Sequence, residues 1–210
     1  LLNAVAGAYG VEQGTIWIEG QDVTLWPEHR RASLIGRVFQ DPMIGTAASM
    51  TIEENLAMAL KRGCRPSLGF GVNQRNRAHF QELLKLLDLG LEDRLKDPVG
   101  LLSGGQRQAL TLLMATISSP KLLLLDEHTA ALDPKTAEQI GELTTQIVGS
   151  KRLTVLMITH NLQDALNFGN RTLMMDQGNI ILDLRNPRRA KMSVDDLLEQ
   201  FVAIRGTRLL

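Results

Sequence analysis

The sequence has little of several features that mark particular classes of protein. It contains one cysteine, Cys64, so no disulfide can form within the chain, which agrees with a reducing compartment. Its 23 basic and 23 acidic residues cancel, which leaves no overall charge to attract nucleic acid. No uninterrupted apolar run approaches the length of a membrane-spanning helix. We therefore expect no nucleic-acid partner, and we expect any association with a membrane to pass through another protein.

The phosphate-binding loop Gly-x-x-x-x-Gly-Lys-[Ser/Thr] is also absent, and the sequence contains no Gly-Lys dipeptide. In one large class of ATPases this loop holds the phosphates of the nucleotide. Its absence is informative because two other segments of the chain have the features of an ATP site.

The first of these is the signature segment, Leu102–Gln108, which reads Leu-Ser-Gly-Gly-Gln-Arg-Gln. Ser103 can cap a helix through its hydroxyl, and Gln106 stands where it completes a reciprocal capping box. Gly104 and Gly105 leave the backbone N–H groups of the first helical turn uncovered. Since the start of a helix attracts anions, the segment predicts a phosphate-binding helix start.

The second is an apolar run, 122–125, that ends in Asp126 and Glu127. Four leucines in a row are typical of a strand buried on both faces of a parallel sheet. In open α/β sheets ligands bind at the carboxyl ends of the strands, which is where the two acids stand. Asp126 is placed to hold Mg²⁺ through water, and Glu127 is placed to orient and polarise the attacking water.

Together these segments resemble the nucleotide-binding subunit of ABC transporters, and the resemblance extends along nearly the whole chain. It implies that the protein binds ATP and Mg²⁺ and hydrolyses ATP. In this family the signature segment closes over the γ-phosphate bound to the opposite subunit. The resemblance therefore implies a head-to-tail dimer in which Ser103, Gly104, Gly105 and Gln106 contact the ATP of the second copy.

Three further residues match positions with a role in this family. Gln40 corresponds to the glutamine that reaches Mg²⁺ and the attacking water, and His160 corresponds to the switch histidine that contacts the γ-phosphate. Asp133 lies in the loop that crosses the dimer interface, and it is also the predicted N-cap of a helix beginning at Pro134. The resemblance thus gives Glu127, His160 and Gln40 as catalytic, with Asp126 and Gln40 at the metal.

His128 departs from the commoner family pattern, in which proline or alanine follows the Asp-Glu pair. The order Asp-Glu-His-Thr resembles a subset of bacterial binding-protein-dependent importers. We predict that His128 is an interface side chain beside Glu127 and not a catalytic one.

The apolar periodicity predicts an α/β fold with a mostly parallel sheet, antiparallel β-hairpins and an inserted α-helical subdomain. The resemblance implies that the sheet belongs to a phosphate-loop NTPase (RecA-like) core. We expect the core to cover 1–45 and 119–210, without its N-terminal part, and the helical subdomain to cover 46–118 and to carry the signature segment. The predicted hairpins lie at 15–23 and 173–184, the strands at 35–40, 122–126 and 154–159, and the helices at 51–60, 75–89, 103–118, 134–148 and 162–168.

The resemblance also implies partners. These are the transmembrane permease subunits, which would dock a short helix near Gln40 and the segment 43–51, and, for an importer, an extracytoplasmic solute-binding protein. The subunit would then lie peripherally on the cytoplasmic face of the cell membrane. Selectivity for the solute belongs to those partners.

In the family the phosphate loop leads into a helix that reads like Leu1–Gly7. We therefore expect this chain to be a fragment that begins just after the loop, and we expect the fragment itself neither to bind nor to hydrolyse ATP. The alternative is a degenerate relative without the loop.

Two other functions stay open at this point. One is a soluble non-transport ABC ATPase, associated with translation or DNA. ABC ATPases that act on DNA have a long coiled coil or zinc modules inserted in the helical lobe. The short spacing from Gln40 to Ser103 excludes the coiled coil, and a single cysteine cannot build a zinc site. The other is a non-catalytic cassette, against which Glu127 and His160 argue.

Overall fold

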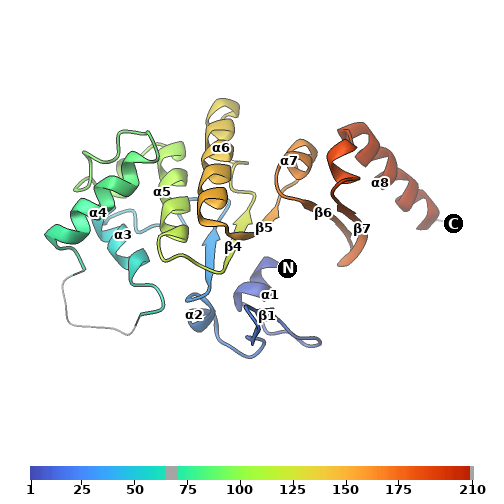
Figure 1. Ribbon diagram of the computed structural model, residues 1–210, viewed down its shortest axis with the longest axis horizontal. Coiled ribbons are helices and arrows are strands. Elements are labelled where there is room, and N and C mark those ends of the chain that lie inside the picture. Colours follow the sequence, from blue (N-terminus) through green and yellow to red (C-terminus); the bar gives the residue numbers. More distant parts are fainter. Residues whose placement is uncertain (65–70, 209–210) are drawn as a thin grey trace. The chain divides into compact units, whose positions relative to one another are not determined.

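The computed structural model describes residues 1–64 and 71–208, which form two compact units, Leu1–Ile158 and Thr159–Leu210 (Figure 1). The first unit contains α1 (Leu2–Ala6), β1 (Trp17–Ile18), β2 (Gln21–Asp22), α2 (Glu28–Arg31), β3 (Ile35–Val38), α3 (Ile52–Leu60), α4 (Gln74–Lys85), α5 (Gly104–Thr116), β4 (Leu122–Asp126), α6 (Pro134–Lys151) and β5 (Thr154–Ile158). The second contains α7 (Leu162–Asn167), β6 (Arg171–Asp176), β7 (Asn179–Arg185) and α8 (Val194–Arg208).

A parallel sheet in the order β3-β4-β5 forms the centre of the first unit. In its register Val38 of β3 lies opposite Leu125 of β4, and Asp126 lies opposite Ile158 of β5. Residues Leu123 to Leu125 are buried, as the sequence predicts for a central parallel strand. The fold class predicted from the sequence is therefore confirmed.

The two faces of β4 pack against different partners because successive side chains of a strand point to opposite sides. Leu123 and Leu125 belong to the larger apolar core, which also contains residues of α3, α4, α5 and α6. Leu124 belongs to a smaller core with Leu2 of α1 and Ile18 of the β1–β2 hairpin. Figure 1 shows α5 and α6 side by side along the sheet.

The helices begin where capping signals stand in the sequence. Thr51 caps α3 in a capping box, since its hydroxyl accepts a hydrogen bond from the Glu54 amide and Glu54 accepts one from the Thr51 amide at 2.8 Å. Glu53 joins α3 to α4 through a bidentate ion pair with Arg77, with distances of 2.7 and 3.0 Å. The division into a core and an inserted helical subdomain stays a prediction.

The second unit contains the predicted antiparallel hairpin, β6–β7, which turns at Gln177 and Gly178, both with positive φ. The sequence did not lead us to predict α8, on which Leu197 is buried while its neighbour Leu198 is exposed. Ser193 stabilises the start of that helix by accepting a hydrogen bond from the Asp196 amide at 3.1 Å.

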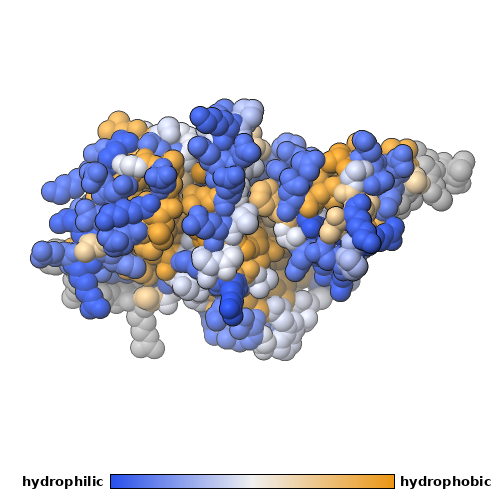
Figure 2. Space-filling model, turned by 45° about the horizontal axis from the view of Figure 1, so that its top comes forward, coloured by the Kyte–Doolittle hydropathy of each residue, from blue (hydrophilic) through white to orange (hydrophobic). Residues whose placement is uncertain are grey.

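Polar residues cover the outer face of α6, as Figure 2 shows in blue. No helix in the part of the chain that the structure describes is long and apolar enough to cross a membrane.

A close approach of β3 to α5 gives a test of this packing. A Cβ added at Gly36 would overlap the backbone carbonyl oxygen of Ala115, which cannot move away without shifting α5. We expect Gly36→Ala to lower the free energy of unfolding by about 2 kcal/mol or more. Gly149→Ala is the matched control: a Cβ there meets nothing within 4 Å, and alanine favours helix, so stability should stay the same or rise by up to about 1 kcal/mol. Equal denaturation midpoints for Gly36→Ala and the unchanged protein would contradict the packing.

Candidate functional site

The carboxyl end of β4 carries the two predicted acids. Asp126 is the last residue of the strand, and Glu127 follows with a left-handed backbone, φ = 44°. The Glu127 amide donates a hydrogen bond to the Ile158 carbonyl of β5 at 3.0 Å. A residue other than glycine pays roughly 1 to 2 kcal/mol for this conformation, so the surroundings must hold it in place.

Gln40 lies at the same edge of the sheet. It follows β3 by two residues and is exposed. Because β3 and β4 are neighbouring parallel strands, with Val38 opposite Leu125, their carboxyl ends meet there. The structure therefore brings Gln40, Asp126 and Glu127 to one edge, as the sequence pattern predicts for a ligand site.

Arg37 lies beside Asp126, a contact that the sequence reasoning missed. Its Nη2 is 3.5 Å from Asp126 Oδ2 and 2.6 Å from Asn3 Oδ1, and its guanidinium lies 4.4 Å from the centre of the Phe39 ring. Arg37 thus joins α1 to the end of β4 and places a positive charge next to the predicted metal ligand. No motif marks it, because its partners come from distant parts of the chain.

The start of α5 forms the predicted capping box. Ser103 Oγ accepts a hydrogen bond from the Gln106 amide at 3.3 Å, and Gln106 Oε1 accepts one from the Ser103 amide at 3.2 Å. Ser103 and Gly104 are exposed. A helix start of this kind can receive an anion on its uncovered N–H groups.

The starts of α5 and α6 pack closely against each other. A Cβ at Gly105 would overlap the methyl group of Thr136 in the first turn of α6. Asp133 caps α6, as predicted, by accepting a hydrogen bond from the Thr136 amide at 3.1 Å. Hydrogen bonds from Thr136 lower the pKa of the Asp133 carboxyl. Gly105 therefore has a packing role within the chain in addition to its predicted role toward ATP.

His160 belongs to the second unit, where it is exposed and precedes Asn161. Asn161 is the N-cap of α7, and its side chain accepts a hydrogen bond from the Gln163 amide at 2.9 Å. The role of His160 at the γ-phosphate stays a prediction.

His128 is buried inside the chain, so the prediction of an interface side chain is wrong. Its exposed fraction is 3%, and its Nε2 lies 3.1 Å from Thr144 Oγ1 of α6. The Thr144 hydroxyl donates to the Ile140 carbonyl at 2.6 Å, so we assign the proton of the neutral ring to Nε2, which donates to Thr144. Burial lowers the pKa of His128 from 6.5 to about 4.

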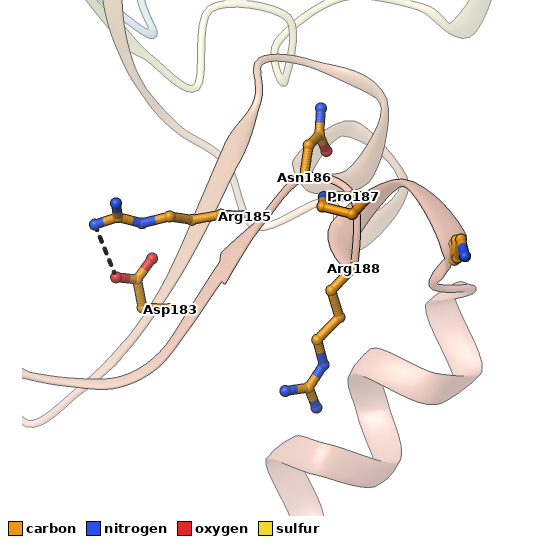
Figure 3. Close-up of a pocket in the computed structure, with 6 residues that line it drawn as sticks. Asp183, Arg185, Asn186, Pro187 and Arg188 are labelled. Carbon is orange, nitrogen blue, oxygen red and sulfur yellow. Dashed lines mark ion pairs between the residues drawn. The ribbon is translucent and has the colours of Figure 1, made fainter.

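A surface pocket in the second unit is lined by Asp183, Arg185, Asn186, Pro187, Arg188 and Lys191. Figure 3 shows Arg185 paired with Asp183, while Arg188 points away from that pair. Asp183 is also bound twice by Arg171, with both distances 2.8 Å. The basic side chains do not converge on a point, so we assign no ligand to this pocket.

Comparison with known proteins identifies the family. The family model described as ABC transporter matches residues 1–130. The chain belongs to the ABC transporter family. It is 42% identical over 201 residues to a tyrosine transport ATP-binding protein of Clostridioides difficile, which covers 96% of this chain and 80% of that protein. It is 34% identical over 184 residues to the thiamine import ATP-binding protein ThiQ of Photorhabdus laumondii, covering 87% and 73%.

Solved structures of ATP-binding cassettes have the same fold. The dimeric structure of the cassette MJ0796 bound to ADP and Pi aligns with a TM-score of 0.71 at 26% identity, covering 88% of this chain and 78% of that one. The cassette MJ1267 aligns with a TM-score of 0.75 at 24% identity, covering 95% and 81%, and shows the fold alone.

The burial of His128 predicts a pH dependence of stability. In the unfolded chain the ring has its ordinary pKa near 6.5, while in the folded chain the pKa is about 4. The contribution of the neutral His128 ring to the free energy of unfolding is complete above pH 6.5. It is lost as the pH falls from 6.5 toward 4, because in this range only the unfolded chain binds the proton. Between about pH 7 and about pH 5 the free energy of unfolding should fall by about 2 kcal/mol more than in His128→Asn, which cannot titrate. Denaturant titrations at both pH values check this, and equal pH dependence in the two proteins would contradict it.

Proposed function

We propose that this chain is the ATP-binding and ATP-hydrolysing subunit that powers a bacterial ABC importer. The observation that carries the proposal is the meeting of Gln40, Asp126 and Glu127 at one edge of the parallel sheet. The relatives support the importer assignment, since their names refer to tyrosine transport and thiamine import.

The residues at this edge suit Mg²⁺ and the phosphates of ATP. Mg²⁺ prefers oxygen ligands, and it is commonly held by one or two protein groups together with waters and substrate phosphates. The Asp126 carboxylate and the Gln40 amide oxygen would hold the ion in this way. No group of three or more His, Cys, Asp or Glu that could hold a metal occurs among the residues described. When bound, the ion neutralises charge on the phosphates.

Glu127 would orient and polarise the attacking water, and His160 would contact the γ-phosphate. Phosphoryl transfer to water depends mainly on such positioning and charge neutralisation, because the protein makes no covalent bond to the phosphoryl group.

A second copy of the chain would complete the site. Ser103, Gly104, Gly105 and Gln106 would contact the ATP bound to the opposite subunit in a head-to-tail dimer, with Asp133 at the dimer interface. The exposure of Ser103 and Gly104 supports this, because a capped helix start with exposed residues can receive a phosphate from outside the chain. The structure of the MJ0796 cassette bound to ADP and Pi is dimeric, which supports a dimer in general.

The permease subunits would dock on an apolar surface of the first unit. Met43, Ile44 and Leu101 are exposed by 44%, 66% and 69%. Arg107 connects the two segments, since it contacts the Met43 sulfur and donates to the Gly100 carbonyl at 3.0 Å. A short apolar helix of a membrane partner fits such a surface. The subunit would then lie peripherally on the cytoplasmic face of the membrane, and an extracytoplasmic solute-binding protein would deliver the solute.

We assign the parts of the chain accordingly. The ATPase core would be 1–45 and 119–210, and 46–118 would be the helical subdomain. The 210 residues contain no phosphate loop, so by themselves they are expected not to bind ATP. For tests of activity we define a loop-extended form, in which a strand and a phosphate loop of the form Gly-x-x-x-x-Gly-Lys-[Ser/Thr] are joined ahead of Leu1.

Removing the charge of Glu127 tests its role in hydrolysis. In the loop-extended form, Glu127→Gln should lower the turnover of ATP by on the order of 10² to 10⁴, because the amide keeps the shape but cannot accept a proton. ATP binding should persist. The substitution Asp126→Asn should instead weaken the dependence of ATP turnover on the Mg²⁺ concentration. Glu138→Gln on the exposed face of α6 is the matched control and should leave turnover unchanged. Near-normal turnover in Glu127→Gln would refute the assignment.

A bulky charge at Ser103 tests the dimer. In the loop-extended form, Ser103→Arg should leave ATP affinity unchanged but prevent the ATP-bound dimer, because Ser103 acts on the nucleotide of the other copy. Size-exclusion chromatography with a slowly hydrolysed ATP analogue measures the dimer fraction. Ser150→Arg, at the far end of α6, is the control and should dimerise normally. If both variants dimerise equally, Ser103 does not act across the interface.

A further inference from the structure

The left-handed backbone at Glu127 needs contacts that hold it. Two of these contacts are backbone–backbone hydrogen bonds. The Glu127 amide donates to the Ile158 carbonyl at 3.0 Å, and the Ala130 amide donates to the Glu127 carbonyl at 2.9 Å. The next carbonyl along the chain, that of His128, accepts a hydrogen bond from the side chain of Gln108 at 2.6 Å. This is the shortest of the three hydrogen bonds, and its donor is a side chain of α5.

Gln108 lies on α5, at the end of the signature segment, and its exposed fraction is 1%. Its Nε2 lies 3.5 Å from the carbonyl of Phe39, the residue before Gln40, in addition to its bond to His128. One amide group therefore joins the segment after β3, the turn after β4, and α5. These are the segments that carry Gln40, Glu127 and the helix of the signature segment.

The hydrogen-bonding groups of the Gln108 side chain are only partly satisfied. Its Oε1 is buried and has no hydrogen-bond partner among the residues that the structure describes. The opposite orientation of the amide would point Oε1 at two carbonyl oxygens, so the partners fix the orientation. A buried acceptor without a partner is unfavourable, so the hydrogen bonds that Nε2 donates to the two carbonyls must offset that penalty.

We propose that Gln108 is a positioning residue that holds the Glu127 backbone in its left-handed conformation and fixes the spacing between Glu127 and Gln40. The His128 ring, bonded to Thr144 of α6, is a second anchor of the same turn. Gln108 thereby links the two predicted catalytic positions to the helix whose start faces the ATP of the other copy. The catalytic part of this inference rests on the proposed function, whereas the structural part does not.

The structural part is tested on the 210-residue chain by amide hydrogen exchange. Gln108→Met keeps the length of the side chain and removes the donor. We expect the amides of Glu127 and Ala130 to exchange about 10-fold faster, while the Asn55 amide in α3 is unchanged. Thr116→Val is the matched control, since Thr116 is also fully buried on α5 but its hydroxyl donates within its own helix, to Leu112 at 2.9 Å.

A second variant covers the case in which Gln108→Met does not fold. Gln108→Asn retains the amide but is one methylene shorter, so its donor falls out of reach of the two carbonyls, and it should give the same local increase. Unchanged exchange at Glu127 in the folded variant, or equal increases in Thr116→Val, would overturn the proposal.

The catalytic part is tested in the loop-extended form. Gln108→Met should lower kcat about 10-fold and leave the Kd for ATP within about twofold. In the Glu127→Gln background the same change should lower kcat no further, because Gln108 acts through Glu127. Additive losses would overturn the catalytic part. If Glu127→Gln itself keeps near-normal turnover, the proposed function fails, while the exchange experiment still decides whether Gln108 holds the turn.

Discussion

The parallel pairing of β3, β4 and β5 is the constraint on which the candidate site depends. β4 is buried between its neighbours, and its register places Asp126 opposite Ile158 and Leu125 opposite Val38. The same pairing carries the Glu127 amide to the Ile158 carbonyl. A shift of this register by one residue would turn the leucines of β4 to the wrong faces and separate the ends of β3 and β4. The burial of the strand thus determines the position of the polar residues at its end.

Two helices then fix the details of that edge. α5 reaches it through Gln108, and α6 reaches it through Thr144, which bonds the buried His128 ring. The starts of the same helices pack together at Gly105 and Thr136. A movement of the α5 start would therefore change the packing at α6 and the hydrogen bond at the turn after β4. The site that we propose, shared between two copies of the chain, would need such a link.

The features predicted correctly are those with local sequence signals. The leucine run predicted β4, and the capping boxes at Thr51 and Ser103 gave the starts of α3 and α5, because a capping residue and its partner are only three positions apart. The burial of His128 and the hydrogen bond from Gln108 to the His128 carbonyl have no local sequence signal. In both cases the contacting residues lie far apart in the sequence. The fold brings these residues together, and the spacing of residues in one sequence does not predict such long-range contacts.

We propose that the edge formed by β3 and β4 binds the metal and the phosphates of ATP. An NMR experiment tests this directly: Mn²⁺ and ADP are added to the loop-extended form, and the paramagnetic broadening of its backbone amide signals is recorded. We expect selective broadening at Gln40 and at Asp126 to His128, and we expect this broadening to be lost in Asp126→Asn. Broadening elsewhere in the first unit, with these amides unaffected, would contradict it.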